Sequence, residues 1–345
     1  MKINFDAIAV LGPTASGKTK FAVRLAAWLA KGPFALPAEI ISADSRQVYR
    51  GMDIGTGKDL ADYKDLQSGL EIPYHLIDVA PAGSKYNIFQ YQRDFARVYA
   101  SLRQRGVMPL VCGGSGLYLQ AATCRYDLKD VPANAALRED LEKRSVEELA
   151  ALLVELKAKR GLKPHNDTDF DNKKRAIRAI EIEMAMLEGS PESSMQQIAL
   201  QQEVDLPQRV LYMGTQVERD ERNRRIDARL KARLQEGMIE EVKGLLESGV
   251  PAEDLIYYGL EYKFITLYLT GAMGREEMEQ RLAVAIHQFA KRQMTWFRGM
   301  ERKGLTVDAV LVQFPIQSRN QRKSWRSMLL YIVLASWPLG CAKPN

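Results

Sequence analysis

One short stretch near the N-terminus limits the possible folds of this chain more than any other. It matches the phosphate-binding pattern G-x-x-x-x-G-K-T and consists of Gly12, Pro13, Thr14, Ala15, Ser16, Gly17, Lys18 and Thr19. An apolar run from Ala7 to Leu11 precedes it, and a helical pattern from Phe21 to Ala30 follows it. This order of strand, glycine loop and helix is the context in which the pattern binds phosphates, whereas a chance match in a Gly-rich turn is the alternative.

The residue types in this stretch suit an anionic ligand. Glycines let the backbone bend so that successive N–H groups face inward, and the helix N-terminus adds a partial positive charge. Lys18 supplies a mobile positive charge for phosphate oxygens, and Thr19 supplies a hydroxyl that suits Mg²⁺. The stretch therefore predicts a diphosphate or triphosphate site, without indicating which molecule carries the phosphates.

Short apolar runs alternate with helical patterns through the first third of the chain. After the first strand we predict strands at Glu39 to Ala43, Tyr74 to Val79 and Met108 to Cys112, and the helix before the last of these ends at Gly106. Such alternation is typical of parallel strands with helices on both faces. The predicted fold class is α/β, a P-loop NTPase-like parallel sheet flanked by helices.

The pattern changes in the middle of the chain. From Ala133 to Glu188 it is charged and helical, and a strand at Gln208 to Gly214 and two long helices, Glu218 to Ser248 and Glu276 to Arg298, follow. The first of these regions carries one apolar stripe, formed by Leu141, Leu149, Leu152, Leu153 and Leu156. This stripe predicts helices that pack on one another in a separate region.

The chain therefore divides into four predicted segments. A P-loop catalytic core covers 1–122 and resumes at 206–315, after a mainly helical insertion over 123–205, and a tail covers 316–345. The tail contains an apolar run from Met328 to Gly340, which is too short to span a bilayer as a helix. We attach no function to this tail.

A second polar group follows the second predicted strand. The carboxyl ends of parallel strands face the ligand crevice, so we expect Asp44 beside the phosphate-binding loop. A carboxylate there can accept a proton from a nucleophile, and Ser45 and Gln47 can hydrogen-bond a base edge. The alternative is that Asp44 and Ser45 only cap a turn, and the residue types alone do not decide between the two.

A glycine-rich cluster follows the fourth predicted strand in the same way. Gly113, Gly114 and Gly116 surround Ser115, and glycines allow the backbone to approach a ligand closely. The cluster is weak support by itself. Three strand ends that converge on one crevice make a ligand site there a stronger prediction.

The chain carries a net charge of +6, which is compatible with a polyanionic partner but does not require one. Positive charge concentrates between Lys173 and Arg178, between Arg219 and Arg233, and between Lys291 and Lys303, where Trp296 and Phe297 are interleaved. Such clusters can bind phosphate backbones and stack bases. The alternatives are solvated helix faces with ion pairs, and core positions for the two aromatic residues. Three arginines share a helical spacing that could direct them at a diphosphate: Arg222, Arg225 and Arg229.

Few residues suit a disulfide framework or a histidine-ligated metal. The cysteines, Cys112, Cys124 and Cys341, lie far apart, and the chain has only three histidines. No signal-peptide pattern precedes the first strand. We therefore expect a cytoplasmic protein that does not associate with membranes. We also expect a monomer.

Together these motifs resemble the tRNA dimethylallyltransferases, the IPP transferase family that prenylates the adenosine next to the anticodon. The likeness runs from residue 7 to about residue 300 in the family's order. The matching blocks after the phosphate-binding loop are Asp44 to Thr56, Gly113 to Tyr118, His165 to Asp167, Lys174 with Arg175 and Arg178, Arg225 to Arg229, and Ala290 to Arg298. The block that begins at Asp44 is far more specific than the loop.

The resemblance implies a transfer reaction. Dimethylallyl diphosphate would bind with its diphosphate in the loop, helped by Arg229 and by Mg²⁺ on Thr19, and the amine of a flipped-out adenine would attack the allylic carbon. Asp44 is then the expected general base. Contacts to the anticodon stem-loop of tRNA would map onto Asp44, Ser45, Arg46, Gln47, Ser115, Lys174, Arg175 and Arg178.

Three positions depart from the family pattern. Ser115 stands where the family usually has threonine, Gly57-Lys58-Asp59 replaces the commoner Ala-Lys-Pro, and Tyr258-Gly259-Leu260-Glu261 is an altered Gly-Tyr motif. These departures leave the phosphate-binding loop and Asp44 unchanged. No zinc-finger extension of the eukaryotic kind follows, which suits a bacterial-type enzyme.

Two other enzyme classes remain open. An adenylate isopentenyltransferase, which acts on the free nucleotide, shares the loop and Asp44 but would not require the helical insertion and its basic groups. A P-loop small-molecule kinase would use Asp78, at the end of the run Leu76-Ile77-Asp78, as a magnesium ligand. The joined motifs favour tRNA prenylation over both.

Overall fold

The structure is a computed structural model that describes residues 3–124, 131–161, 172–188, 205–302 and 304–311. Its contacts divide the chain into two compact units, one of Met1–Tyr126 with Asp205–Asn345 and the other of Asp127–Val204. The predicted tail and the block His165 to Asp167 lie outside the described residues.

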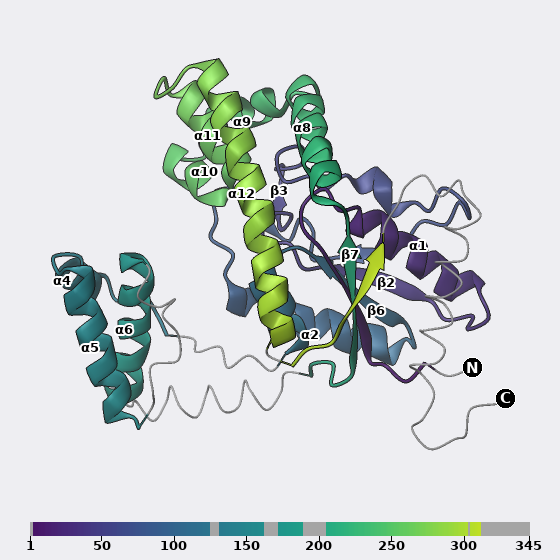
Figure 1. Ribbon diagram of the computed structural model, residues 1–345, viewed down its shortest axis with the longest axis horizontal. Coiled ribbons are helices and arrows are strands. Elements are labelled where there is room, and N and C mark those ends of the chain that lie inside the picture. The colour runs from purple at the N-terminus through teal and green to yellow at the C-terminus, as the bar shows by residue number, and fades with distance from the viewer. Residues whose placement is uncertain (1–2, 125–130, 162–171, 189–204, 303, 312–345) are drawn as a thin grey trace. The chain divides into compact units, whose positions relative to one another are not determined.

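A six-stranded sheet forms the centre of the larger unit (Figure 1). The strand order is β4-β2-β6-β1-β7-β8, and all neighbouring strands pair in parallel. The strands are β1 (Ala7–Leu11), β2 (Ala38–Ser42), β4 (Tyr74–His75), β6 (Met108–Gly113), β7 (Val210–Gln216) and β8 (Val307–Leu311). The predicted α/β class with a parallel sheet is therefore confirmed.

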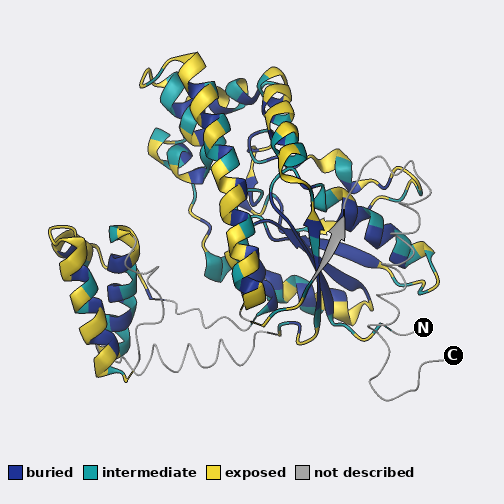
Figure 2. Ribbon diagram, in the orientation of Figure 1, coloured by how far each residue is buried: buried dark blue, intermediate teal, exposed yellow. Residues whose placement is uncertain are grey.

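Helices cover both faces of this sheet. The helices that pack on its strands are α1 (Lys18–Lys31), α2 (Ile88–Gln104) and α3 (Gly116–Thr123). The other helices of this unit pack mainly on one another: α8 (Arg219–Gln235), α9 (Met238–Glu247), α10 (Ala252–Tyr258), α11 (Leu260–Leu269) and α12 (Arg275–Arg302). Ile40 and Leu110 pack against α1 in one core, whereas Ile41 and Val111 point to the opposite face, where α2 packs on β2 and β6. All four side chains are buried, as are most of the strands in Figure 2.

Several predicted boundaries are wrong, for local backbone reasons. The helix predicted from Glu218 to Ser248 is two helices, because Gly237 has a φ of 101° and a left-handed residue cannot continue a right-handed helix. The strand predicted from Tyr74 to Val79 is only β4, because Leu76 and Asp78 have positive φ angles of 61° and 58° and leave the β region. The short strands β3 (Tyr49–Arg50) and β5 (Ala80–Pro81), the 3-10 helix η1 (Leu60–Tyr63) and the edge strand β8 were not predicted.

The smaller unit is helical within its described residues. It contains α4 (Ala135–Leu141), α5 (Val146–Lys159) and α6 (Lys173–Glu188), and Ser145 with Glu148 forms a capping box at the start of α5. The apolar stripe predicted from the sequence is confirmed, because its leucines form one core with residues of α6. The buried members are Leu141, Leu149, Leu153, Leu156, Ala176, Ile177 and Ile180, with Leu152 partly buried against them.

No described helix combines the length and the hydropathy that a membrane span requires.

An ion-pair cluster at the amino end of β2 makes stability dependent on pH. Both guanidinium nitrogens of Arg105 donate to the carboxylate of Glu39, at 2.8 and 2.9 Å, and His75 Nε2 lies 2.7 Å from Glu39 Oε2. The hydrogen bond from Arg105 lowers the pKa of Glu39 below its ordinary value, although burial opposes the shift. Because the folded-state pKa is the lower one, this stabilisation is complete above the ordinary pKa of the carboxyl and is lost as the pH falls through the lowered pKa.

We expect Glu39→Gln to lower the free energy of unfolding at pH 7 by about 1–3 kcal/mol, since it removes hydrogen bonds to a charged acceptor. The loss should shrink at pH values below the ordinary pKa of glutamate. Urea unfolding at pH 7 and at pH 4 checks both statements. Glu71→Gln is the matched control, because Glu71 is 81% exposed and lies 3.8 Å from Lys64 in a surface pair. Equal losses in the two variants would contradict the prediction.

Candidate functional site

The predicted phosphate-binding loop joins β1 to α1. Ala15 and Gly17 have φ angles of 60° and 79°, and such left-handed positions turn successive N–H groups toward one side of a loop. Ser16 is completely buried, and its Oγ accepts a hydrogen bond of 2.7 Å from the hydroxyl of Thr215 on β7. The loop is therefore anchored to the neighbouring strand, with the N-terminus of α1 beginning at Lys18.

The ends of β2 and β6 meet beside this loop. The Ser45 N–H donates to Ser115 Oγ at 3.1 Å, and the two serine hydroxyls are 3.3 Å apart. A Cβ at Gly114 would stand 3.5 Å from Lys18 Nζ, so the phosphate-loop lysine lies against the glycine cluster. The structure thus brings together the three strand ends that the sequence singles out.

The electrostatic setting of Lys18 also reflects this convergence. Desolvation lowers the pKa of Lys18 below its ordinary value, and the positive charges of Arg229 and Arg233 lower it further. The carboxylate of Asp44 acts in the opposite direction. Three cations and one carboxylate therefore influence one another here, and a bound anion would relieve the repulsion among the cations.

Arg229 and Arg233 share one carboxylate partner. Their Nη2 atoms lie 3.0 and 3.2 Å from Asp59 Oδ2, and a Cβ at Gly57 would stand only 2.1 and 2.0 Å from the same two nitrogen atoms. The sequence analysis assigned a role to Arg229 but not to Arg233. The i,i+4 spacing of the two arginines on α8 is the signal that could have identified Arg233.

Of the three arginines predicted to act together, Arg222, Arg225 and Arg229, only Arg229 contacts Asp59. Arg225 donates to Glu221 on its own helix at 2.7 Å. Desolvation lowers the pKa of Arg222, and the charges of Arg219 and Arg298 lower it further. The predicted group of three is therefore replaced by the pair of Arg229 and Arg233.

Asp44 makes the turn contact that the alternative interpretation requires, and one of its oxygens remains unused. Its Oδ1 accepts a hydrogen bond of 2.9 Å from the N–H of Arg46. Within the described part of the chain, its Oδ2 has no hydrogen-bond donor. The carboxylate can therefore cap the turn and accept a proton at the same time.

Two neighbouring residues predicted to contact RNA are engaged within the protein. Gln47 donates to the Gly57 carbonyl at 3.0 Å and accepts from the Ser42 hydroxyl at 3.1 Å. Arg46 donates to the carbonyl of Tyr257 at 3.3 Å, and its guanidinium lies 6.0 Å from the centre of the exposed Tyr257 ring. Their roles in reading RNA stay predictions.

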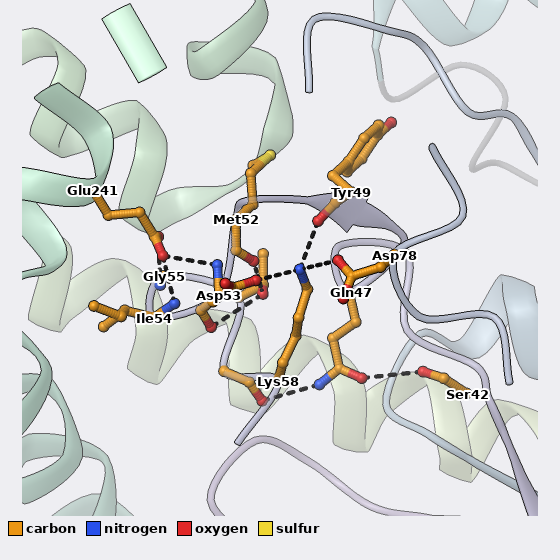
Figure 3. A network of polar contacts seen from close by, with 12 residues as sticks. Ser42, Gln47, Tyr49, Met52, Asp53, Ile54, Gly55, Lys58, Asp78 and Glu241 are labelled. Atoms are coloured by element: carbon orange, nitrogen blue, oxygen red, sulfur yellow. Dashed lines mark hydrogen bonds and ion pairs between the residues drawn. The ribbon is translucent and has the colours of Figure 1, made fainter. Parts of the chain in front are cut away.

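A buried lysine holds the loop that follows Gln47, as Figure 3 shows. Lys58 is 1% exposed and its Nζ donates to the Tyr49 carbonyl at 2.7 Å, to Asp53 at 2.5 Å and to Asp78. Asp78 was the residue that a kinase would use for magnesium. Its carboxylate is instead a partner of Lys58.

The same loop is attached to α9 by a single carboxylate (Figure 3). Glu241 accepts hydrogen bonds from three successive N–H groups, those of Asp53, Ile54 and Gly55, at 2.8, 2.7 and 3.1 Å. The Tyr262 hydroxyl also donates to Glu241 at 2.5 Å. Lys58 and Glu241 together fix the loop that carries Asp59 toward the arginines of α8.

Glu261 is a further acidic residue beside Asp44 and the arginine pair, and no role was predicted for it. Burial raises the pKa of Glu261, Arg233 and Arg229 lower it, and Asp44 acts on it as a neighbouring negative charge. Its place in the altered Gly-Tyr motif was the only sequence signal.

The predicted RNA-binding residues of the smaller unit lie on α6. Lys174 and Arg175 are exposed, whereas Arg178 donates to the Val131 carbonyl at 2.8 Å and to Glu181 at 3.2 Å. Arg178 therefore stabilises its own unit, and RNA binding by the three residues stays a prediction.

The two aromatic residues near the end of α12 differ from each other. Phe297 is buried, in agreement with the core interpretation, but Trp296 is 41% exposed. A Cβ at Gly116 would stand 2.1 Å from the Trp296 ring. Trp296 therefore packs on the glycine cluster rather than in the core.

Comparisons with known sequences point to one family. The sequence model of the family "IPP transferase" matches residues 47–300. A Porphyromonas gingivalis protein called tRNA dimethylallyltransferase 2 is 54% identical over 307 residues, which cover 88% of this chain and 94% of that protein. A Bacteroides fragilis tRNA dimethylallyltransferase 2 is 51% identical over 92% of this chain and 96% of that protein.

Solved structures give the same result for the fold. The full-length tRNA isopentenylpyrophosphate transferase from Bacillus halodurans superposes with a TM-score of 0.63 at 29% identity, and covers 96% of this chain and 97% of its own. A eukaryotic dimethylallyltransferase that acts on tRNA reaches a TM-score of 0.69 at 20% identity, over 98% of this chain and 82% of its own.

Proposed function

The chain belongs to the IPP transferase family, and from the geometry of its site we propose how it works as a tRNA dimethylallyltransferase. It transfers a dimethylallyl group to the exocyclic amine of the adenosine on the 3′ side of the anticodon and releases pyrophosphate. The observation that supports this proposal is the meeting of three strand ends, where Lys18 lies against Gly114 and the charge of Asp44 acts on Lys18. We propose dimethylallyl diphosphate as the donor.

The phosphate-binding loop would hold the leaving group. As the bond between the allylic carbon and the diphosphate oxygen breaks, negative charge grows on the leaving oxygens. Lys18, Arg229 and the N–H groups of the loop could stabilise that charge, and electrostatic stabilisation of this kind is usually the largest single contribution to catalysis. A P-loop therefore suits an enzyme that need not use ATP.

Asp44 would take the proton from the acceptor. The adenine amine forms a bond to carbon while carbon–oxygen cleavage releases pyrophosphate, and one N–H proton must leave the nitrogen. The unused oxygen of Asp44 is a suitable acceptor next to the leaving-group loop. Extrusion of the adenine costs a few kcal/mol, and less in an unpaired loop than in a duplex.

Mg²⁺ is the metal that we propose for this site. In the described ranges, no group of three or more His, Cys, Asp or Glu side chains could hold a metal ion. Mg²⁺ does not require such a group, because it usually takes one or two protein oxygens plus substrate phosphates and water. Thr19 would supply the protein oxygen, and the ion would neutralise charge on the diphosphate.

The smaller unit would contact the anticodon stem-loop through α6. We expect the double substitution Lys174→Glu and Arg175→Glu to weaken tRNA binding and to reduce the slope of log affinity against log salt by about 1–2, because each phosphate contact contributes about 0.7–0.9. Binding titrations at salt concentrations from about 50 to about 200 mM measure this slope. Lys159→Glu is the control, because Lys159 is paired with Glu155 at 2.8 Å in the same unit. An unchanged slope in the double variant would contradict the RNA contact and indicate that these residues of α6 form a solvated helix face.

The choice of acceptor separates this function from the alternatives. Labelled dimethylallyl diphosphate is incubated with an unmodified anticodon stem-loop that has consecutive adenosines after the anticodon, and in parallel with AMP. We expect label in the RNA. Label on AMP alone would support the adenylate enzyme, and ATP turnover dependent on a small alcohol would support the kinase. The cytoplasmic location and the monomeric state stay predictions.

A further inference from the structure

Gln293 on α12 hydrogen-bonds two of the three loops at once. Its Oε1 accepts from the Thr14 N–H in the phosphate-binding loop at 2.8 Å, and its Nε2 donates to the Gly114 carbonyl in the glycine cluster at 2.9 Å. The residue is 7% exposed. Because the amide is buried, loss of either hydrogen bond would leave a buried polar group without a partner, which is costly in free energy.

The contacts continue from Gly114 to the expected general base. Ser115 follows Gly114, and its hydroxyl accepts the N–H of Ser45, which is the residue next to Asp44. One series of bonded neighbours therefore runs from Thr14, beside the leaving group, through Gln293 and Ser115 to Asp44. Gln293 is the member of this series that comes from a helix outside the loops.

The packing around the Gln293 amide is tight. A Cβ at Gly114 would stand 2.5 Å from Gln293 Nε2 and 3.5 Å from Lys18 Nζ. The amide and the lysine thus both lie on the side of Gly114 to which a Cβ would project, where it would clash with the amide and only contact the lysine. Ala290 and Phe297, one turn before and after Gln293, are buried and hold α12 in place.

An amide is suited to this position because it carries both a hydrogen-bond acceptor and a donor. The Thr14 N–H needs an acceptor and the Gly114 carbonyl needs a donor, and a glutamine supplies both from one side chain. A methionine of similar size supplies neither. An ionised glutamate would place an oxygen against the Gly114 carbonyl, whereas its protonated form again offers one donor and one acceptor.

We propose that Gln293 is a positioning residue that fixes the leaving-group loop at a set distance from Asp44 and the adenine amine. This inference rests on the proposed function, since it names the residue that aligns the two substrates of the same site. Displacements of about 1 Å can cost about 100-fold in rate when two reactants must be aligned.

The test measures single-turnover transfer, pyrophosphate binding and the thermal midpoint for Gln293→Met. We expect the transfer rate to fall by about 10- to 100-fold, pyrophosphate to bind several-fold more weakly, and RNA affinity to stay the same. Gln280→Met is the matched control, because Gln280 is an exposed glutamine on the same helix. It should match the unsubstituted protein in all three measurements. A lowered thermal midpoint with unchanged rate and unchanged pyrophosphate affinity would overturn the proposal.

Gln293→Glu provides a readout that loss of stability cannot imitate. Its transfer rate, divided by that of the unsubstituted protein at the same pH, should rise as the pH is lowered, because the protonated acid restores the donor to Gly114. A ratio independent of pH would contradict the inference. If the unsubstituted protein fails to prenylate RNA, the proposed function fails, and pyrophosphate titration of the Gln293 and Gln280 variants still tests the ordering of the loop.

Discussion

We expect the replacement of Asp44 by asparagine to lower the rate of prenyl transfer by about 100-fold or more and to leave RNA binding nearly unchanged. Asparagine keeps an oxygen that can accept the Arg46 N–H, so the turn after β2 is retained. What it loses is the ability to take a proton from the adenine amine. Single-turnover transfer with saturating donor, together with a binding titration of the stem-loop, separates the two effects.

The comparison with Asp44→Ala sharpens this prediction. Alanine loses both the turn contact and the proton acceptor, so a base role predicts similar rates for the two variants. A role limited to capping the turn predicts that Asp44→Asn stays near full activity and only Asp44→Ala is impaired. Asp227→Asn is the control, because Asp227 is 59% exposed and pairs with His287 outside the three strand ends.

We expect the replacement of Lys18 by alanine to lower kcat/KM for dimethylallyl diphosphate by about 100- to 1,000-fold, which is the usual cost of removing one donor to a developing anion. Lys18 is partly buried, and its pKa is lowered by burial and by the charges of Arg229 and Arg233, so bulk water screens its charge less than at an exposed site. Steady-state kinetics with a fixed RNA concentration gives the effect on kcat/KM.

Lys20→Ala is the matched control for this substitution. Lys20 lies two residues further along α1, is 56% exposed and pairs with Asp62 at 3.4 Å. It should change kcat/KM by less than about twofold, as expected for a surface ion pair. If both variants lost activity equally, general damage to α1 would explain the result and the diphosphate role of Lys18 would be wrong.

The sequence was sufficient to predict the fold class and the convergence of the three strand ends. Strands such as β1 and β6 are continuous apolar runs, and a parallel sheet places the residues after them at one edge. The glycine pattern fixed the loop between β1 and α1 without any tertiary information. These features depend on local sequence and on a general rule of topology.

Other features of the site depend on contacts between residues that are distant in sequence. Gln293 lies in a buried stripe of α12, and a polar residue in such a stripe indicates a hydrogen-bond partner without naming Thr14 or Gly114. Likewise, Asp59 reads as a departure from a family motif, and only the fold brings it to Arg229 and Arg233. The break at Gly237 shows the same limit, because glycine is tolerated in many helices and the left-handed backbone there is visible only in the structure.

The most direct measurement of the central claim is the stoichiometry of the transfer. Dimethylallyl diphosphate with separate labels on its prenyl and diphosphate groups is mixed with excess enzyme and stem-loop RNA, and the products are counted over one turnover. We predict one pyrophosphate released for each dimethylallyl group found on the adenosine that follows the anticodon. Pyrophosphate released without prenylated RNA, or a prenyl group found on any other acceptor, would contradict the claim that an RNA amine displaces the diphosphate in this site.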